Sequence, residues 1–128
     1  MNRALSICFL IVAVIHLLPL AGVLGAPRLS ALYGVEVTDP NLEILLRHRA
    51  VLFGILGGFF VYAAFRPHLR AVALVIGLIS VVSFLLLAYA VGGYNPQVGR
   101  VVSADWIALA ALLVAATVYW RASRSPTQ

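Results

Sequence analysis

The chain has 128 residues, of which 63% are hydrophobic and 10% are charged, and its mean hydropathy is +1.06. Soluble domains use about 45–50% apolar and about 25% charged residues, so this composition excludes an ordinary soluble protein and predicts one integral membrane domain over residues 1–128. The net charge of +5 does not indicate nucleic-acid binding, because the basic residues flank apolar stretches. Cys8 is the single cysteine, which excludes an internal disulfide and a C-x-x-C redox pair.

Four apolar stretches reach the length of about 20 residues that a helix needs to cross a bilayer. They span about residues 4–24, 40–65, 71–91 and 96–121. The first has the basic start of a secretory signal, but its apolar part exceeds the about 7–15 residues of a signal core, so we expect it to be retained as a helix. The sequence therefore predicts an all-α fold, a four-transmembrane-helix bundle of up-down topology.

The segment between the first two predicted spans, residues 25–38, is more polar and contains two glycines and a proline. We expect it to be an interfacial loop that lies on the bundle. Its apolar side chains would insert into the bundle; they are Leu29, Leu32, Tyr33 and Val35.

The second and fourth predicted spans begin with the same signal. Asp39-Pro40 and Asn95-Pro96 each combine an N-cap side chain with a proline at the first helical position. Superposing the two prolines, an offset of 56 residues, aligns Arg49 with Asp105. The two residues are therefore expected at similar depths in the membrane, and a duplicated two-helix unit is one interpretation of the pattern.

The charges separate according to the side of the membrane. With four spans, the N-terminus, the turn at 66–70 and the C-terminal tail share one side, which carries five arginines and no acid: Arg3, Arg66, Arg70, Arg121 and Arg124. All four acids lie on the other side, together with the remaining four arginines. By the positive-inside rule, both termini are cytoplasmic. We expect a multi-pass protein of the bacterial inner membrane.

Each predicted span carries a polar side chain in the half that is nearer the non-cytoplasmic side. Ionisable residues inside a membrane usually face the interior of a bundle, where they pair. We therefore predict an outer-half polar pocket whose binding residues are His16, Arg47, Arg49, Ser83 and Asp105, with Arg49 in contact with Asp105. The pattern assigns no catalytic residue, no metal site and no cofactor.

The uncharged members of this set also have structural interpretations. His16 lies three residues before Pro19, and it can bind a helix carbonyl that the proline leaves free. Ser80 and Ser83 can hydrogen-bond to carbonyls of their own helix.

The charged members have alternatives as well. Glu43 and Arg47 are placed at i and i+4 and can form a solvated ion pair of little energetic value. Arg49 lies about 200° around the helix from Arg47, so the two arginines cannot face the same neighbour. Asp105 can instead lie at the interface with Arg100.

Two glycines predict a close helix contact in the second span. Gly54 and Gly58 are four residues apart and form a small-xxx-small surface. We expect another helix to pack closely against this face.

One block of the sequence carries a resemblance to a known group. The stretch LYGVEVTDPNLEILLRHRAVLFG, followed by two more spans and a Gly-Tyr-Asn loop, resembles uncharacterised bacterial four-helix membrane proteins of the DoxX-like group. The resemblance implies the four-helix fold but no catalytic residue. Some proteins of this pattern are labelled phosphopantetheine adenylyltransferase; the residues do not support that activity, because the chain has no glycine-rich phosphate loop and no H-x-G-H pattern.

Three functional interpretations follow. The favoured one is a non-enzymatic binding or accessory module that takes a lipid, a quinone or a small anion in the outer pocket, or that contacts a membrane partner. The second is a small homo-oligomeric transporter, which is disfavoured because Asp105, the acid within a span, lies near its end. The third is a membrane enzyme that uses His16 and Asp105 as acid and base.

Overall fold

The structure is a computed structural model that describes residues 2–126. Within that range every regular element is helical: α1 (Arg3–Leu17), η1 (Leu18–Leu24), α2 (Ala26–Tyr33), α3 (Pro40–Ala64), η2 (Pro67–Leu69), α4 (Arg70–Val91) and α5 (Pro96–Arg124). Four segments are long and apolar enough to cross a membrane: Arg3–Leu24, Pro40–Ala64, Pro67–Val91 and Pro96–Arg124. The predicted all-α class and the four membrane-length helices are confirmed. The last helix continues beyond the predicted end at residue 121, to Arg124.

The first span changes its helix type near Pro19. Asn2 caps its start, because the Asn2 Oδ1 accepts hydrogen bonds from the N–H groups of Ala4 at 3.1 Å and Leu5 at 3.4 Å. Pro19 has no N–H to continue the α-helical ladder, and α1 gives way to the tighter 3₁₀ segment η1. The two elements together still form one segment of membrane length.

The segment after the first span contains a helix where a loop was predicted. α2 ends at Tyr33 and is capped by Gly34, whose φ of 63° lies in the left-handed region that favours glycine. Leu29 and Tyr33 are buried and Leu32 is partly buried, so the segment does pack onto the bundle. Val35 is 37% exposed, so it is less deeply inserted than the other three side chains. The eight residues of α2 are too few for a hydrophobic period to be recognised in the sequence.

Both proline-led spans begin where the sequence predicted. The Asp39 side chain accepts a hydrogen bond from the N–H of Asn41 at 2.9 Å, and the Asn95 side chain accepts one from the N–H of Val98 at 2.8 Å. A proline occupies the first helical position in each case. These caps satisfy N–H groups that would otherwise be unpaired at the start of a helix.

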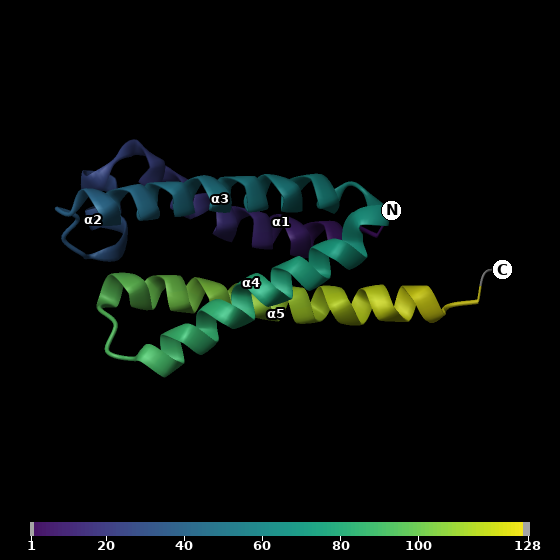
Figure 1. Cartoon of the computed structure of the whole chain (residues 1–128). Helices are drawn as coiled ribbons and strands as arrows, with labels where there is room; N and C mark the ends of the chain where they lie inside the picture. The colour runs from purple at the N-terminus through teal and green to yellow at the C-terminus, as the bar shows by residue number, and fades with distance from the viewer. Residues whose placement is uncertain (1, 127–128) are drawn as a thin grey trace.

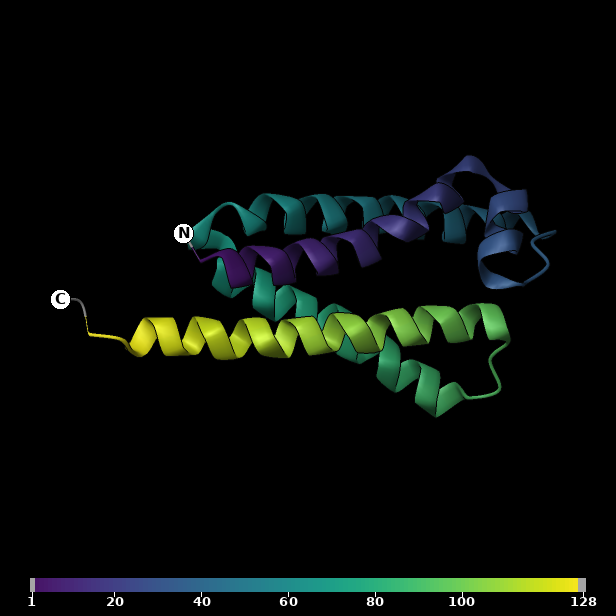
Figure 2. The same cartoon turned by 180° about the vertical axis from the view of Figure 1, so that it is seen from behind.

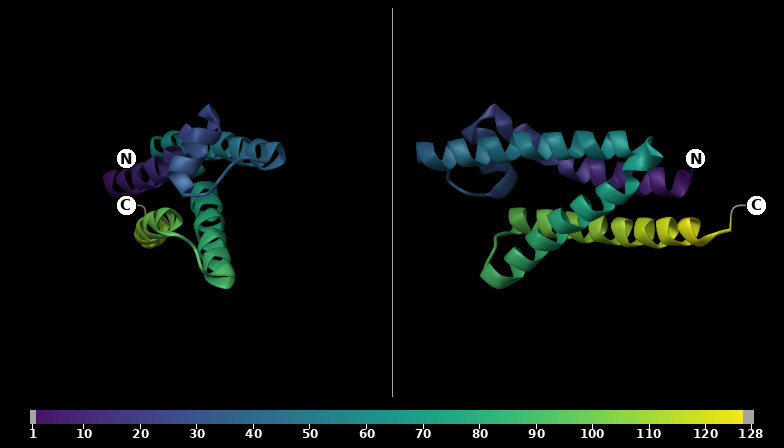
Figure 3. Two further views of the ribbon diagram at one scale, coloured as in Figure 1. Left: turned by 90° about the vertical axis from the view of Figure 1, so that its left-hand side faces the viewer. Right: turned by 45° about the vertical axis from the view of Figure 1, so that its right-hand side comes forward.

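Successive spans run antiparallel, so the chain ends at residues 2 and 126 lie at the same end of an up-down bundle (Figures 1 and 2). α1 packs along α3 and also contacts α5. α4 leaves α3 at their connecting turn and crosses α5 obliquely, which separates α3 from α4 toward the end of the bundle that holds α2 (Figure 3). The two helix pairs therefore pack differently, and the arrangement gives no support to the interpretation as a duplicated unit.

Glycines bring α1 and η1 close to α3, although not at the predicted pair. A Cβ added at Gly54 would lie 2.6 Å from a Leu20 side-chain carbon, and one at Gly57 would lie 2.6 Å from the Leu17 Cγ and 3.1 Å from the Leu17 backbone nitrogen. A Cβ at Gly58 would meet no atom within 4 Å. The close-packed row thus joins Gly54 to Gly57, three residues later, instead of to Gly58, four residues later. Both spacings form ridges on the surface of a helix.

The core between the helices is apolar with one charged exception. Its largest fully buried side chains include Phe9, Phe60 and Leu112, and Gly77 of α4 allows Leu112 and Phe60 to approach. Arg70, the first residue of α4, is only 6% exposed, and its Nε and Nη2 atoms have no hydrogen-bond partner among the described residues. A buried donor without a partner destabilises a fold.

Candidate functional site

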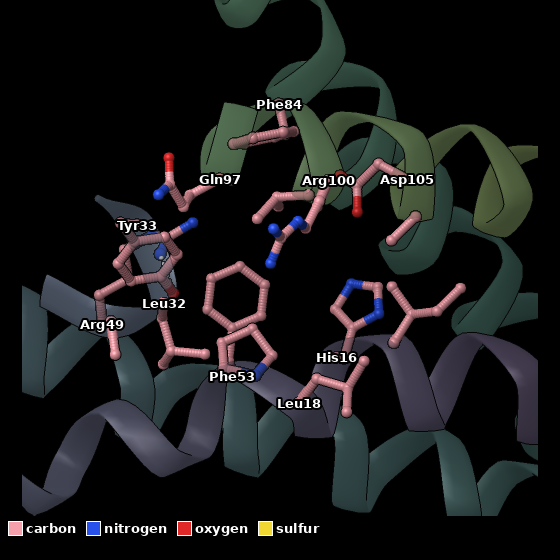
Figure 4. A pocket seen from close by; sticks show the side chains of 15 residues that line it. His16, Leu18, Leu32, Tyr33, Arg49, Phe53, Phe84, Gln97, Arg100 and Asp105 are labelled. Carbon is pink, nitrogen blue, oxygen red and sulfur yellow. Dashed lines mark hydrogen bonds between the residues drawn. The ribbon is translucent and has the colours of Figure 1, made fainter. Parts of the chain in front are cut away.

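A cavity of about 220 Å³ is lined in part by α2, which lies at the end of the bundle opposite the two chain ends (Figure 1). Figure 4 shows the side chains of its wall from close by. Every helix from α1 to α5, and η1 as well, contributes to its wall. Most of the lining side chains are apolar, which favours a ligand with an apolar body. Six polar side chains complete the wall: His16, Tyr33, Arg49, Gln97, Arg100 and Asp105.

Arg49 is held at one end of the cavity by aromatic side chains. Its Nη1 donates a hydrogen bond to the Tyr33 hydroxyl at 2.9 Å. Its guanidinium carbon lies 4.6 Å from the centroid of the Phe53 ring and 5.4 Å from that of the Tyr33 ring. Such contacts stabilise a cation in a site with few acids. Because Tyr33 belongs to α2, the packing of α2 onto the bundle decides where Arg49 points.

Asn95 fixes the position of Tyr33. Its Nδ2 donates hydrogen bonds to the backbone carbonyls of Tyr33 at 2.8 Å and Gly34 at 3.1 Å. The Oδ1 of the same side chain caps α5 through the N–H of Val98. One amide therefore joins the end of α2 to the start of α5, and both elements line the cavity.

Arg100 and Asp105 reach the cavity from α5. Figure 4 shows Asp105 near His16, with Arg49 and Tyr33 toward the opposite end and Arg100 between the two groups. Within residues 2–126, neither Arg49 nor Arg100 forms a salt bridge with Asp105. The predicted contact between Arg49 and Asp105 is therefore not formed, although the two residues line the same cavity.

His16 is 2% exposed and is hydrogen-bonded at both ring nitrogens. Its Nδ1 lies 2.8 Å from the carbonyl oxygen of Val12, which can only accept, so Nδ1 is the donor. A neutral ring then accepts at Nε2 from the Ser80 hydroxyl, 3.0 Å away on α4. The ring also packs against Phe60, with the two centroids 5.0 Å apart. His16 thus joins α1 to α4 while it lines the cavity.

Two of the predicted binding residues lie outside the cavity. The Arg47 side chain is 47% exposed; its Nε donates to the Val23 carbonyl at 3.0 Å and its Nη1 lies 3.4 Å from Glu43. Ser83 is exposed, and its hydroxyl donates to the Ser80 carbonyl of its own helix at 3.0 Å. These contacts agree with the structural interpretations of the two residues, namely an ion pair of Arg47 with Glu43 and a hydrogen bond of Ser83 to a carbonyl of its own helix.

The prediction missed three polar residues of the wall, namely Tyr33, Gln97 and Arg100. The two on α5 could have been found, because Gln97, Arg100, Ala104 and Asp105 recur at helical spacing and so share a face with the acid that was singled out. Tyr33 had no such signal, since its place depends on the fold of a segment that was predicted to be a loop.

A second cavity of about 280 Å³ lies beside the first. Its wall is almost entirely apolar and comes from α3, α4, α5 and the region of Tyr33 and Val35. Four side chains line both cavities: Tyr33, Arg49, Phe84 and Val101. The two cavities therefore adjoin at these shared side chains.

Comparisons of the chain with protein-family models, with curated proteins and with solved structures found no match. Within residues 2–126, no group of three or more His, Cys, Asp or Glu side chains is placed to hold a metal ion. The chemistry of the site therefore rests on the geometry of its own side chains. Two guanidinium groups and one carboxylate line a mainly apolar cavity, which is an arrangement that favours an anionic group on an otherwise apolar molecule.

Proposed function

We propose that this protein is a membrane-embedded, non-enzymatic binding module for a small amphiphile with an anionic head. One observation carries the proposal: Arg49 and Arg100 converge with a single acid, Asp105, on a cavity of about 220 Å³ with mainly apolar walls. The guanidinium groups supply several N–H donors for a carboxylate or phosphate oxygen, and the walls accept a hydrocarbon part. His16 contributes to the shape of the cavity, since both its ring nitrogens are already bonded.

The proposal includes a location and an orientation. The chain resides in a bacterial inner membrane, with both termini in the cytoplasm and the cavity in the outer half of the bilayer. The positive-inside rule supports this orientation, because the side that holds both termini carries five arginines and no acid. The relation to the DoxX-like group is likewise a proposal, and it rests on the block at residues 32–54.

The orientation predicts the labelling of introduced cysteines. Starting from a Cys8→Ser protein, a cysteine at His68 is expected to react with a membrane-impermeant maleimide only after the cells are opened. A cysteine at Thr38, on the opposite loop, is expected to react in intact spheroplasts. The reverse pattern would contradict the proposed orientation and place the cavity in the inner half of the bilayer.

The proposed ligand class predicts a specific dependence on Arg49. Octanoate is expected to bind the protein in zwitterionic nanodiscs, and octanol, which lacks the charge, is expected to bind far more weakly. Arg49→Ala should weaken octanoate binding by about tenfold to a hundredfold, since a hydrogen bond to a charged group contributes about 1.5–3 kcal/mol. Equilibrium dialysis of labelled octanoate, with empty nanodiscs subtracted, measures both.

Arg47→Ala is the matched control for that experiment. Arg47 lies two residues away on the same helix, but its side chain faces Val23 and Glu43 outside the cavity. Octanoate affinity should therefore stay unchanged in Arg47→Ala. Equal losses in the two variants would indicate a general effect of surface charge, and no binding that depends on Arg49 would refute the proposed function. Mass spectrometry of lipids that copurify with the wild-type and Arg49→Ala proteins would extend the test to native ligands.

A further inference from the structure

The two neighbouring cavities differ sharply in chemistry. The wall of the first cavity holds Arg49, Arg100 and Asp105, whereas among the described residues Arg49 is the only charged side chain in the wall of the second. The Arg49 guanidinium, bonded to the Tyr33 hydroxyl, stands at the boundary between the cavities. Arg49 thus lies where the charged first cavity adjoins the apolar second cavity.

The second cavity lies where the bundle is least closed. α3 and α4 contact each other little and diverge toward this end, as the end-on view in Figure 3 shows. Leu42 and Leu46 of α3 and Phe84 of α4 contribute to the wall on either side of the divergence. Leu42 and Val35, which also line this cavity, are each 37% exposed. Because Leu42, Leu46 and Phe84 belong to the membrane-length helices α3 and α4, we expect this part of the apolar wall to face hydrocarbon chains rather than water.

We infer that the ligand is a long-chain anionic amphiphile taken from the bilayer, such as a fatty acid. Its head contacts Arg49 and Arg100 in the first cavity, and its chain passes the Arg49–Tyr33 pair and leaves between α3 and α4 through the second. This inference rests on the proposed function and extends it by a chain length and a route. A small water-soluble anion would leave the second cavity without a role, because that cavity offers almost no polar contact.

Photoreactive fatty acids test the route. Two hexadecanoic acid probes are used, one with a diazirine next to the carboxylate and one with the diazirine near the chain end. In zwitterionic nanodiscs, the first probe is expected to label the wall of the first cavity, at Leu32 or Phe53. The second is expected to label the second cavity, at Leu42, Leu46 or Val98. Mass spectrometry of peptides locates the adducts, and labelling that persists in Arg49→Ala is subtracted as background.

A variant separates the route from the binding itself. Leu46→Trp fills the second cavity and should abolish chain-end labelling there, while octanoate, which fits the first cavity, binds as in the wild type. Chain-end adducts spread over lipid-facing residues, with octanoate binding still dependent on Arg49, would overturn the route and leave the proposed function standing. Loss of all Arg49-dependent binding would overturn both. Unchanged chain-end labelling in Leu46→Trp would also refute the route.

Discussion

Gly57→Leu is expected to destabilise the folded bundle by about 3 kcal/mol, the upper end of the usual range for an overpacked core. A Cβ at this position would lie 2.6 Å from the Leu17 Cγ and 3.1 Å from the Leu17 backbone nitrogen. A side chain can change its rotamer, but the backbone of α1 can move away only if the whole helix separates from α3. Because lipid is as apolar as the core, the loss arises from packing and not from exposure to water.

Gly58→Leu is the control for this prediction. The two glycines are adjacent and helical, so the gain in helix propensity from leucine is the same at both. Gly58 has open space around its Cα, and its substitution should change stability by less than about 1 kcal/mol. Unfolding by sodium dodecyl sulfate in mixed micelles, followed by circular dichroism, gives both values. Equal effects at the two positions would contradict the close approach of α1 at Gly57.

Arg70→Met is expected to stabilise the protein, by about 1–3 kcal/mol, the cost of a buried donor without a partner. Nε and Nη2 of Arg70 are buried and unpaired among the described residues, while methionine fills a similar volume without a charge. Thermal unfolding in a non-ionic detergent, followed by circular dichroism, measures the change. The effect should be seen in a detergent without anionic groups, so that no detergent head can pair with the guanidinium.

Arg66→Met serves as the comparison. Arg66 is exposed and its guanidinium carbon lies 5.2 Å from the centroid of the Tyr62 ring, so its substitution should change stability by no more than about 0.5 kcal/mol. A loss of stability in Arg70→Met, with Arg66→Met unchanged, would contradict the expected stabilisation.

The candidate site was only partly predictable. His16 and Asp105 were predicted because a polar residue within an apolar span can be recognised from the sequence alone, and both line the cavity. The choice of Arg49 over Arg47 depended on an apparent repeat that the packing does not support. Arg49 enters the cavity for another reason: Tyr33, sixteen residues earlier, accepts its hydrogen bond. That contact could not be predicted while the segment of Tyr33 was expected to be a loop.

The sequence alone determined the membrane-length helices and the all-α class, because hydropathy over about 20 residues is a local signal. It also determined where the helices start, because a cap lies within one turn of the helix that it begins. How the helices cross decides three further features: the close-packed row from Gly54 to Gly57, the oblique path of α4 and the two adjoining cavities. Crossing is decided by the fit of side chains far apart in the sequence, as at Gly57 and Leu17 or Asn95 and Tyr33. Periodicity shows which residues share a face, but only the packed structure decides which helix that face meets.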